Sequence, residues 1–81
     1  MTDWIVGGNA DARQAFAREK GIVNPLYIHA ECDVRGRTLR EGDRIFWLWP
    51  PPDERVAYAL SVLATYAGKP LSHFDAYKLR G

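Results

Sequence analysis

The chain has 81 residues, 47% of them hydrophobic and 12% aromatic, so it is long enough for one small domain and too apolar for a disordered segment. Eleven basic and ten acidic residues give a net charge of +1, which disfavours nucleic acid as a partner without excluding it. One cysteine allows no intrachain disulfide, and no apolar run approaches the roughly 20 residues of a membrane span. These features predict a cytoplasmic protein with a single domain, residues 1–81, and no membrane partner.

The first part of the chain predicts a strand near residues 4–7 and a helix near residues 10–20. A short apolar run forms the strand, and Gly7 and Gly8 stop it. Asn9 is a favourable N-cap, because its side chain can accept a hydrogen bond from a free helix amide. The apolar stripe of the helix is narrow, and four positions are expected to share its inward face: Ala12, Ala15, Phe16 and Glu19.

Two further strands are predicted in the middle of the chain, near residues 26–30 and 44–49. The first alternates in polarity, which is typical of a strand with one buried face. The second is apolar on both faces, as expected of a central strand, and Pro50 ends it because proline cannot donate to a strand ladder.

The last third of the chain contains the clearest helix, predicted near residues 53–67. Its apolar side chains recur at helical spacing: Val56, Leu60, Leu63 and Ala67. Residues 71–79 are ambiguous. Ser72 and Asp75 fit a capping box for a last short helix, whereas residues 74–79 equally fit an edge strand.

This order of elements predicts an α/β fold: a small three-stranded, mainly parallel sheet of Rossmann-like type with two main helices. The expected strand order is 2-1-3, with an extra C-terminal helix or edge strand left open. The alternative is a hairpin that turns at Arg35 and Gly36, which would make the second and third strands antiparallel.

A candidate ligand-binding site follows the first strand, at Gly7, Gly8 and Asn9. Ligands of open parallel sheets bind at the carboxyl ends of the strands, where segments 31–33 and 49–53 should meet this turn. Glycines let a ligand approach the backbone, and the helix N-terminus offers amides to an anion. The alternative is a tight turn with an Asn cap, since no dinucleotide fingerprint or phosphate-loop lysine follows.

Candidates for catalytic or metal chemistry are few. His29 and Cys32 are three residues apart, which on a strand puts them on opposite faces, and His73 is remote in the sequence. No catalytic residue, metal site or cofactor is therefore predicted. An enzyme that uses Cys32 with a histidine base remains the third alternative for function.

Five residues are candidates for binding a protein partner, because Trp and Arg dominate interface hot spots: Trp47, Trp49, Arg35, Arg37 and Arg40. The alternative is that one tryptophan is core and that the arginines pair with acidic neighbours in their own loop, namely Asp33, Glu41 and Asp43.

The run from Trp4 to Asn9, its Ala/Arg-rich helix, residues 26–31 and the Arg35-Gly36 step resemble those of small Rossmann-like proteins of actinobacterial phages. The resemblance covers roughly residues 4–60. Most of those proteins have no assigned activity. The resemblance implies a phage or prophage origin and a minimal Rossmann-like sheet. It carries no catalytic residue onto this chain, and the missing phosphate-loop lysine argues against nucleotide hydrolysis.

The leading hypothesis is therefore a non-catalytic protein-interaction module that acts on a host partner. The alternative is a domain that binds a small ligand, nucleotide or phosphate through Gly7, Gly8 and Asn9. The sequence leaves a homodimer open.

Overall fold

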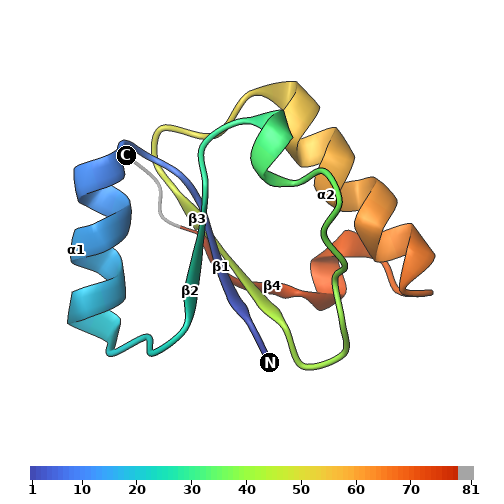
Figure 1. Ribbon diagram of the computed structural model, residues 1–81, viewed down its shortest axis with the longest axis horizontal. Helices are drawn as coiled ribbons and strands as arrows, with labels where there is room; N and C mark the ends of the chain where they lie inside the picture. The colour runs from blue at the N-terminus through green and yellow to red at the C-terminus, as the bar shows by residue number, and fades with distance from the viewer. Residues whose placement is uncertain (79–81) are drawn as a thin grey trace.

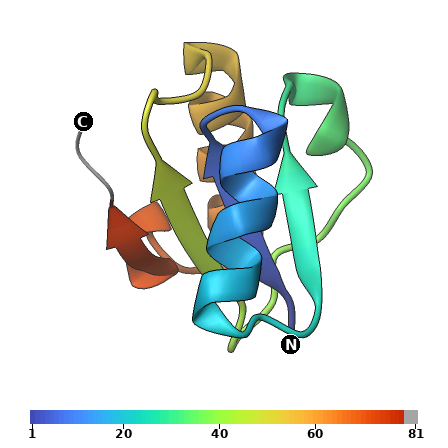
Figure 2. The same cartoon turned by 90° about the vertical axis from the view of Figure 1, so that its left-hand side faces the viewer.

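The computed structural model describes residues 1–78, which form a sheet between two helices (Figure 1). The elements in chain order are β1 (Asp3–Gly7), α1 (Ala10–Lys20), β2 (Pro25–Ile28), the 3-10 helix η1 (Glu31–Asp33), β3 (Arg44–Leu48), α2 (Glu54–Tyr66), the 3-10 helix η2 (Leu71–His73) and β4 (Asp75–Lys78). All strand pairs are parallel, in the order β2-β1-β3-β4. Helix α1 crosses one face of the sheet, as Figure 2 shows, and α2 covers the other.

The predicted α/β class, the order 2-1-3 and both helices are confirmed. The alternative hairpin at Arg35 and Gly36 is wrong, because β2 and β3 lie on opposite sides of β1 and both run parallel to it. The sheet has four strands rather than three, since residues 75–78 pair with β3 as an edge strand. Residue 79 of the predicted edge strand and residues 79–81 of the predicted domain lie outside the described residues.

The core on the α2 face follows the predicted stripe in part: Val56 and Leu60 are buried, whereas Leu63 and Ala67 are partly buried and pack against the core. Val56, Leu60 and Ala64 are the buried residues of α2, and Leu60 is fully buried. They pack against alternate residues of the sheet, including Trp4 of β1 and Ile45 of β3. The helical period of the apolar residues therefore identified the inward face of α2 correctly.

The predicted inward face of α1 is partly wrong. Its buried residues are Arg13, Phe16 and Ala17, whereas Ala15 and Glu19 are exposed. Phe16 sets the orientation of the helix, because its ring packs on Phe46 of β3 at a centroid distance of 5.3 Å. The buried face then passes through Arg13, whose charge hides it from a pattern based on hydrophobicity.

No helix within residues 1–78 is long and apolar enough to cross a membrane.

Candidate functional site

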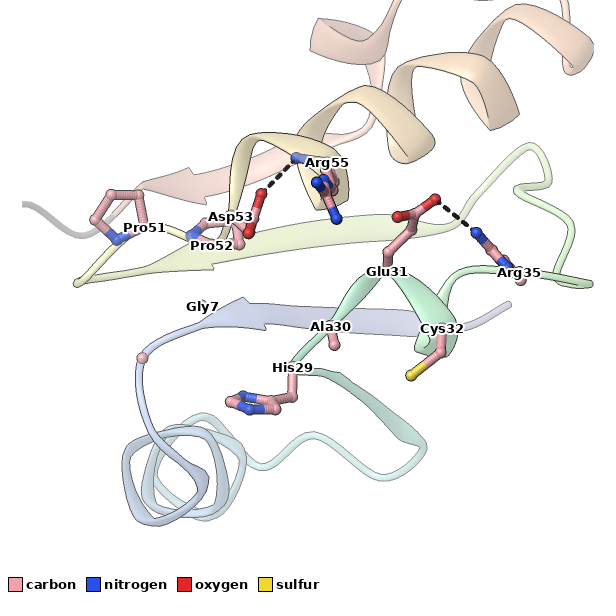
Figure 3. Close-up of a pocket in the computed structure, with 11 residues that line it drawn as sticks. Gly7, His29, Ala30, Glu31, Cys32, Arg35, Pro51, Pro52, Asp53 and Arg55 are labelled. Carbon is pink, nitrogen blue, oxygen red and sulfur yellow. Dashed lines mark hydrogen bonds and ion pairs between the residues drawn. The ribbon is translucent and has the colours of Figure 1, made fainter.

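A cleft of about 650 Å³ opens where β1, β2 and β3 end (Figure 3). It is lined by Gly7 and Gly8 after β1, by residues 29–32 and Arg35 after β2, and by residues 51–53 and Arg55 after β3. The chain connects β1 to β2 on one side, and β3 pairs with the other side of β1. The cleft thus lies at the topological switch point, where open α/β sheets bind ligands.

The turn after β1 is held by its own hydrogen bonds. The amide of Gly8 donates to the carbonyl of Pro50 at 2.9 Å. Nη1 of the buried Arg13 donates to the carbonyls of Gly7 at 3.0 Å and Gly8 at 2.8 Å. Asn9 accepts from the amide of Ala12 at 2.7 Å and so caps α1 as expected. These polar groups serve the fold, and Asn9 does not line the cleft.

Packing also explains why residues 7 and 8 are glycines. Both have positive φ, 88° and 63°, which side chains rarely adopt. A Cβ on Gly7 would collide with the carbonyl oxygen of Leu48, and one on Gly8 would lie 3.3 Å from Cβ of Ala12. The glycines therefore allow the turn to lie against β3 and α1, and their role in binding a ligand stays a prediction.

The segment after β2 is shaped by Asp33. One of its carboxylate oxygens accepts hydrogen bonds from the amides of His29 at 2.8 Å and Ala30 at 3.0 Å. These two bonds stabilise the ionised carboxylate and lower the pKa of Asp33 below its ordinary value. The turn that they close places Glu31 and Cys32 at the cleft.

Two arginines contribute positive charge to the cleft. Arg35 pairs with Glu31 at 3.2 Å, and both side chains are substantially exposed. Arg55, on the first turn of α2, makes no ion pair within residues 1–78. In Figure 3, Glu31 lies between the two arginines. The remaining carboxylate, Asp53, caps α2 by accepting from the amide of Arg55 at 2.9 Å.

Both carboxylates of the cleft are thus occupied, one by Arg35 and one by a helix amide, while the guanidinium of Arg55 is available. An available guanidinium suits a phosphate or carboxylate, to which it can donate two parallel hydrogen bonds. Asp53 keeps its negative charge when it accepts the amide, so the lining stays balanced in charge, and what the cleft offers an anion is the unpaired guanidinium of Arg55.

Cys32 and His29 also line the cleft, but among the described residues no hydrogen bond joins the thiol to the ring. Cys32 is exposed and free. Within residues 1–78, no group of three or more His, Cys, Asp and Glu side chains is placed to hold a metal ion.

The five residues predicted to bind a partner lie on three surfaces. Trp47 and Trp49 border a groove of about 370 Å³ between the β3–α2 loop, η2 and β4. Arg35 lines the cleft, whereas Arg37 and Arg40 border a hollow of about 410 Å³ near the start of β1 and β2. The structure therefore brings the two tryptophans together but separates them from the arginines.

Comparison with protein-family models, curated proteins and solved structures found no match. Function is therefore argued from the geometry of the chain alone.

The sequence did not predict two arginines of this region: Arg13, which binds the turn at Gly7 and Gly8, and Arg55, which lines the cleft. The signal for Arg55 is its position, because the first turn of a helix that follows a parallel strand borders the ligand-binding edge of the sheet. Arg13 lies four residues after the N-cap, so its side chain points back over the first turn of α1. Nothing in the sequence alone distinguishes it from the exposed Arg18.

Proposed function

We propose that this domain binds a small phosphate-bearing molecule, such as a nucleotide, in the cleft at the ends of β1, β2 and β3. The observation that carries the proposal is the guanidinium of Arg55, which borders the cleft and has no carboxylate partner within residues 1–78. The proposal places the anion at the arginines of the cleft, whereas the sequence predicted the amides after Gly8.

Three features support an anionic ligand of this size. The volume of about 650 Å³ falls within the range of small-molecule sites. Arg55 lies at the positive end of the α2 dipole, which adds to the attraction for an anion. Arg35 can exchange Glu31 for a ligand, because an exposed ion pair is worth at most about 1 kcal/mol.

The test is a titration with inorganic phosphate, AMP and ATP, followed by calorimetry and by amide NMR shifts. We expect Arg55→Gln to weaken binding at least about tenfold, since a hydrogen bond to a charged group contributes about 1.5–3 kcal/mol. Arg18→Gln, an equal loss of charge at an exposed position of α1, should leave the affinity unchanged. Binding should also weaken as salt rises.

Two results would contradict the proposal. One is the absence of any shift at millimolar concentrations of all three compounds. The other is an equal loss of affinity in Arg55→Gln and Arg18→Gln, which would mean that the anion responds to overall charge rather than to the cleft.

A second candidate function is protein binding without catalysis, which one observation favours. Trp49 is 55% exposed beside an apolar groove in which the only charged residues from the described part of the chain, Asp75 and Lys78, pair with each other at 3.4 Å. An exposed tryptophan is a frequent interface hot spot. The phage origin remains an expectation from the resemblance, and the host-encoded partner remains part of the leading hypothesis from the sequence.

Trp49→Ala tests this second function. We expect the variant to lose capture of the partner from a host lysate while it keeps the parent's unfolding midpoint. A variant that unfolds instead would show that Trp49 is needed by the core, and the second candidate would then lose its support.

A further inference from the structure

A polar hollow lies at the opposite end of the sheet from the cleft, where β1 and β2 begin. In Figure 2 this is the end at which the N-terminus is marked, and the arrows of β2 and β3 point away from it. The hollow has a volume of about 410 Å³, within the range of small-molecule sites. Its walls come from three segments: residues 2 and 4, residues 24–26, and residues 36–38 and 40. It shares no lining residue with the cleft.

The polar side chains of this amino-end hollow are mostly hydrogen-bond donors. Arg37 and Arg40 each bring a guanidinium, which carries several N–H donors and no acceptor. Thr2, Thr38 and Asn24 add two hydroxyls and an amide. No carboxylate from residues 1–78 lines the hollow. The lining therefore suits an anion, and it carries none of the carboxylates that would hold a cation.

The carboxylates that follow Arg40 in the sequence bind other groups. Asp43 is 7% exposed and accepts hydrogen bonds from the amides of Thr2 at 2.8 Å and Arg40 at 3.0 Å. Glu41 lies 3.3 Å from the ring of His73. Neither carboxylate lines the hollow, and the Arg40 guanidinium makes no ion pair within residues 1–78. Arg40 is therefore available to a ligand.

Arg37 is partly occupied. Its Nε donates to the carbonyl of Asp33 at 2.9 Å, and the carboxylate of Asp33 attracts its charge at a distance longer than that of an ion pair. The Nη groups of Arg37 make no hydrogen bond within residues 1–78. Arg40 is consequently the principal cation of the hollow, and Arg37 is a second, weaker one.

Trp4 provides an independent observation. It is 1% exposed, yet its indole Nε1 has no hydrogen-bond partner within residues 1–78. Buried polar groups seldom lack a partner. Trp4 borders the amino-end hollow, and it borders neither the cleft nor the groove beside Trp49. A ligand that carries acceptor oxygens into this hollow therefore brings them next to a buried donor that has no acceptor.

We infer that the amino-end hollow binds a small oxyanion, the phosphate or carboxylate of a small molecule, which accepts two parallel hydrogen bonds from Arg40 and is attracted also by Arg37. A nucleic-acid chain fits less well, because the net charge of the protein is only +1. The inference goes beyond the proposed function and does not depend on it, since the two sites lie at opposite ends of the strands.

The probes are inorganic phosphate and succinate, each titrated into the 15N-labelled chain at constant ionic strength. We expect amide shifts within residues 2–4, 24–26 and 36–40, a shift of the indole N–H signal of Trp4, and a dissociation constant in the millimolar range or below. Binding of phosphate alone, of succinate alone or of both identifies which oxyanion the hollow takes.

Variants of the chain locate the contact. Arg40→Gln should weaken binding at least about fivefold, because it removes hydrogen bonds between charged groups. Arg40→Lys should recover only part of the loss, since an ammonium keeps the charge without the planar pair of donors. Arg18→Gln is the control for charge, and Arg55→Gln is the control for the cleft; both should leave the shifts of the hollow unchanged. Thermal unfolding of each variant checks that the fold is intact.

Four results would overturn the inference. They are no shifts at millimolar phosphate and succinate, shifts confined to the cleft, amide shifts without a shift of the Trp4 indole, and equal losses of affinity in Arg40→Gln and Arg18→Gln. Tighter binding of single-stranded oligothymidine that depends on Arg40 would also overturn it, because the hollow would then belong to a nucleic-acid surface. Shifts confined to the cleft would still support the proposed function, so the two sites are tested separately.

Discussion

Gly7 and Gly21 both have positive φ, but only Gly7 lies against another part of the chain. A Cβ on Gly7 meets the backbone of Leu48, which cannot move aside without disturbing β3, while a Cβ on Gly21 meets nothing within 4 Å. The two positions illustrate two different requirements for glycine at a turn. Gly21 is needed only for its backbone conformation, whereas Gly7 is needed also because the neighbouring backbone leaves no room for a Cβ.

We expect Gly21→Ala to lower the free energy of unfolding by about 1–2 kcal/mol, the general cost of a left-handed alanine. Gly7→Ala should lower it by more, because the collision adds to the same strain. Urea denaturation at 25 °C measures both. Equal losses would show that the turn relaxes, so that the close approach to Leu48 does not determine the residue at position 7.

Leu60 is fully buried at the centre of the contact between α2 and the sheet. We expect Leu60→Ala to lower the free energy of unfolding by about 2–5 kcal/mol, through lost transfer energy and the cavity left behind. In a domain of this size, that loss approaches the entire stability. A loss below about 1 kcal/mol would contradict the placement of Leu60 against the sheet.

Sequence pattern predicted Leu60 and missed Arg13 for the same physical reason. Hydrophobic periodicity finds residues that are buried because they are apolar. Arg13 is 6% exposed because its guanidinium binds the carbonyls of Gly7 and Gly8, and that requirement exists only after the chain has folded. Trp49 is the opposite case: it is apolar, it follows a core strand, and it remains 55% exposed.

At the level of elements, η1 depends on the ionised carboxylate of Asp33. Hydrogen bonds from the amides of His29 and Ala30 lower the pKa of Asp33 below its ordinary value of 3.8. A group whose pKa is lower in the folded state adds stability above the unfolded-state value, and this stability is lost as the pH falls through the folded-state value. The effect therefore belongs to acid conditions, below about pH 4.

Asp33→Asn should accordingly be less stable than the parent at pH 7, because the neutral amide accepts the two bonds more weakly. The difference between the two unfolding midpoints should shrink between pH 5 and pH 2, as the parent's own carboxylate becomes protonated. Urea midpoints measured across that range test this expectation. A difference that is constant from pH 7 to pH 2 would mean that the charge of Asp33 does not matter.

The elements themselves were predictable in proportion to their apolar content. β3 and α2 are strongly apolar and were located to within one residue at each end. The segment 71–79 combines capping residues with apolar ones, and its pairing partner β3 is some 30 residues away in the sequence, so local signals could not decide its structure. The position of the cleft followed from topology alone. Its chemistry did not, because the availability of Arg55 depends on which carboxylates are already occupied.

On the scale of the whole molecule, the segment of η2 and β4 covers β3 on the side that faces away from β1, where β4 pairs with it. Phe74, which joins them, is 2% exposed and belongs to the core cluster of α2. The amide of Ile45 donates to the carbonyl of Phe74 at 2.8 Å, so the C-terminal segment is bonded directly to β3. This segment is therefore an integral part of the domain.

A chain ending at residue 70 should lose cooperative unfolding, since it exposes the core around Phe74 and leaves the edge of β3 unpaired. Loss of the near-ultraviolet circular dichroism of the buried aromatic residues would report this. The control is full-length Tyr77→Ala, which removes only a partly exposed ring packed on Phe16 and should unfold cooperatively. A cooperative transition in the shortened chain would show that β4 is dispensable.

The all-parallel sheet has a consequence for how the chain is made. Its first strand, β1, is one of the two interior strands and bonds to strands that begin at residues 25 and 44. Within residues 1–78, no hydrogen-bonded pair of strands is joined by a short turn, so no hairpin can form early and guide the rest. During synthesis, the backbone groups of β1 that bond to β3 must therefore remain without this partner until β3 has left the ribosome. The first strand can therefore complete its hydrogen bonding only together with a strand that lies some 40 residues later in the chain.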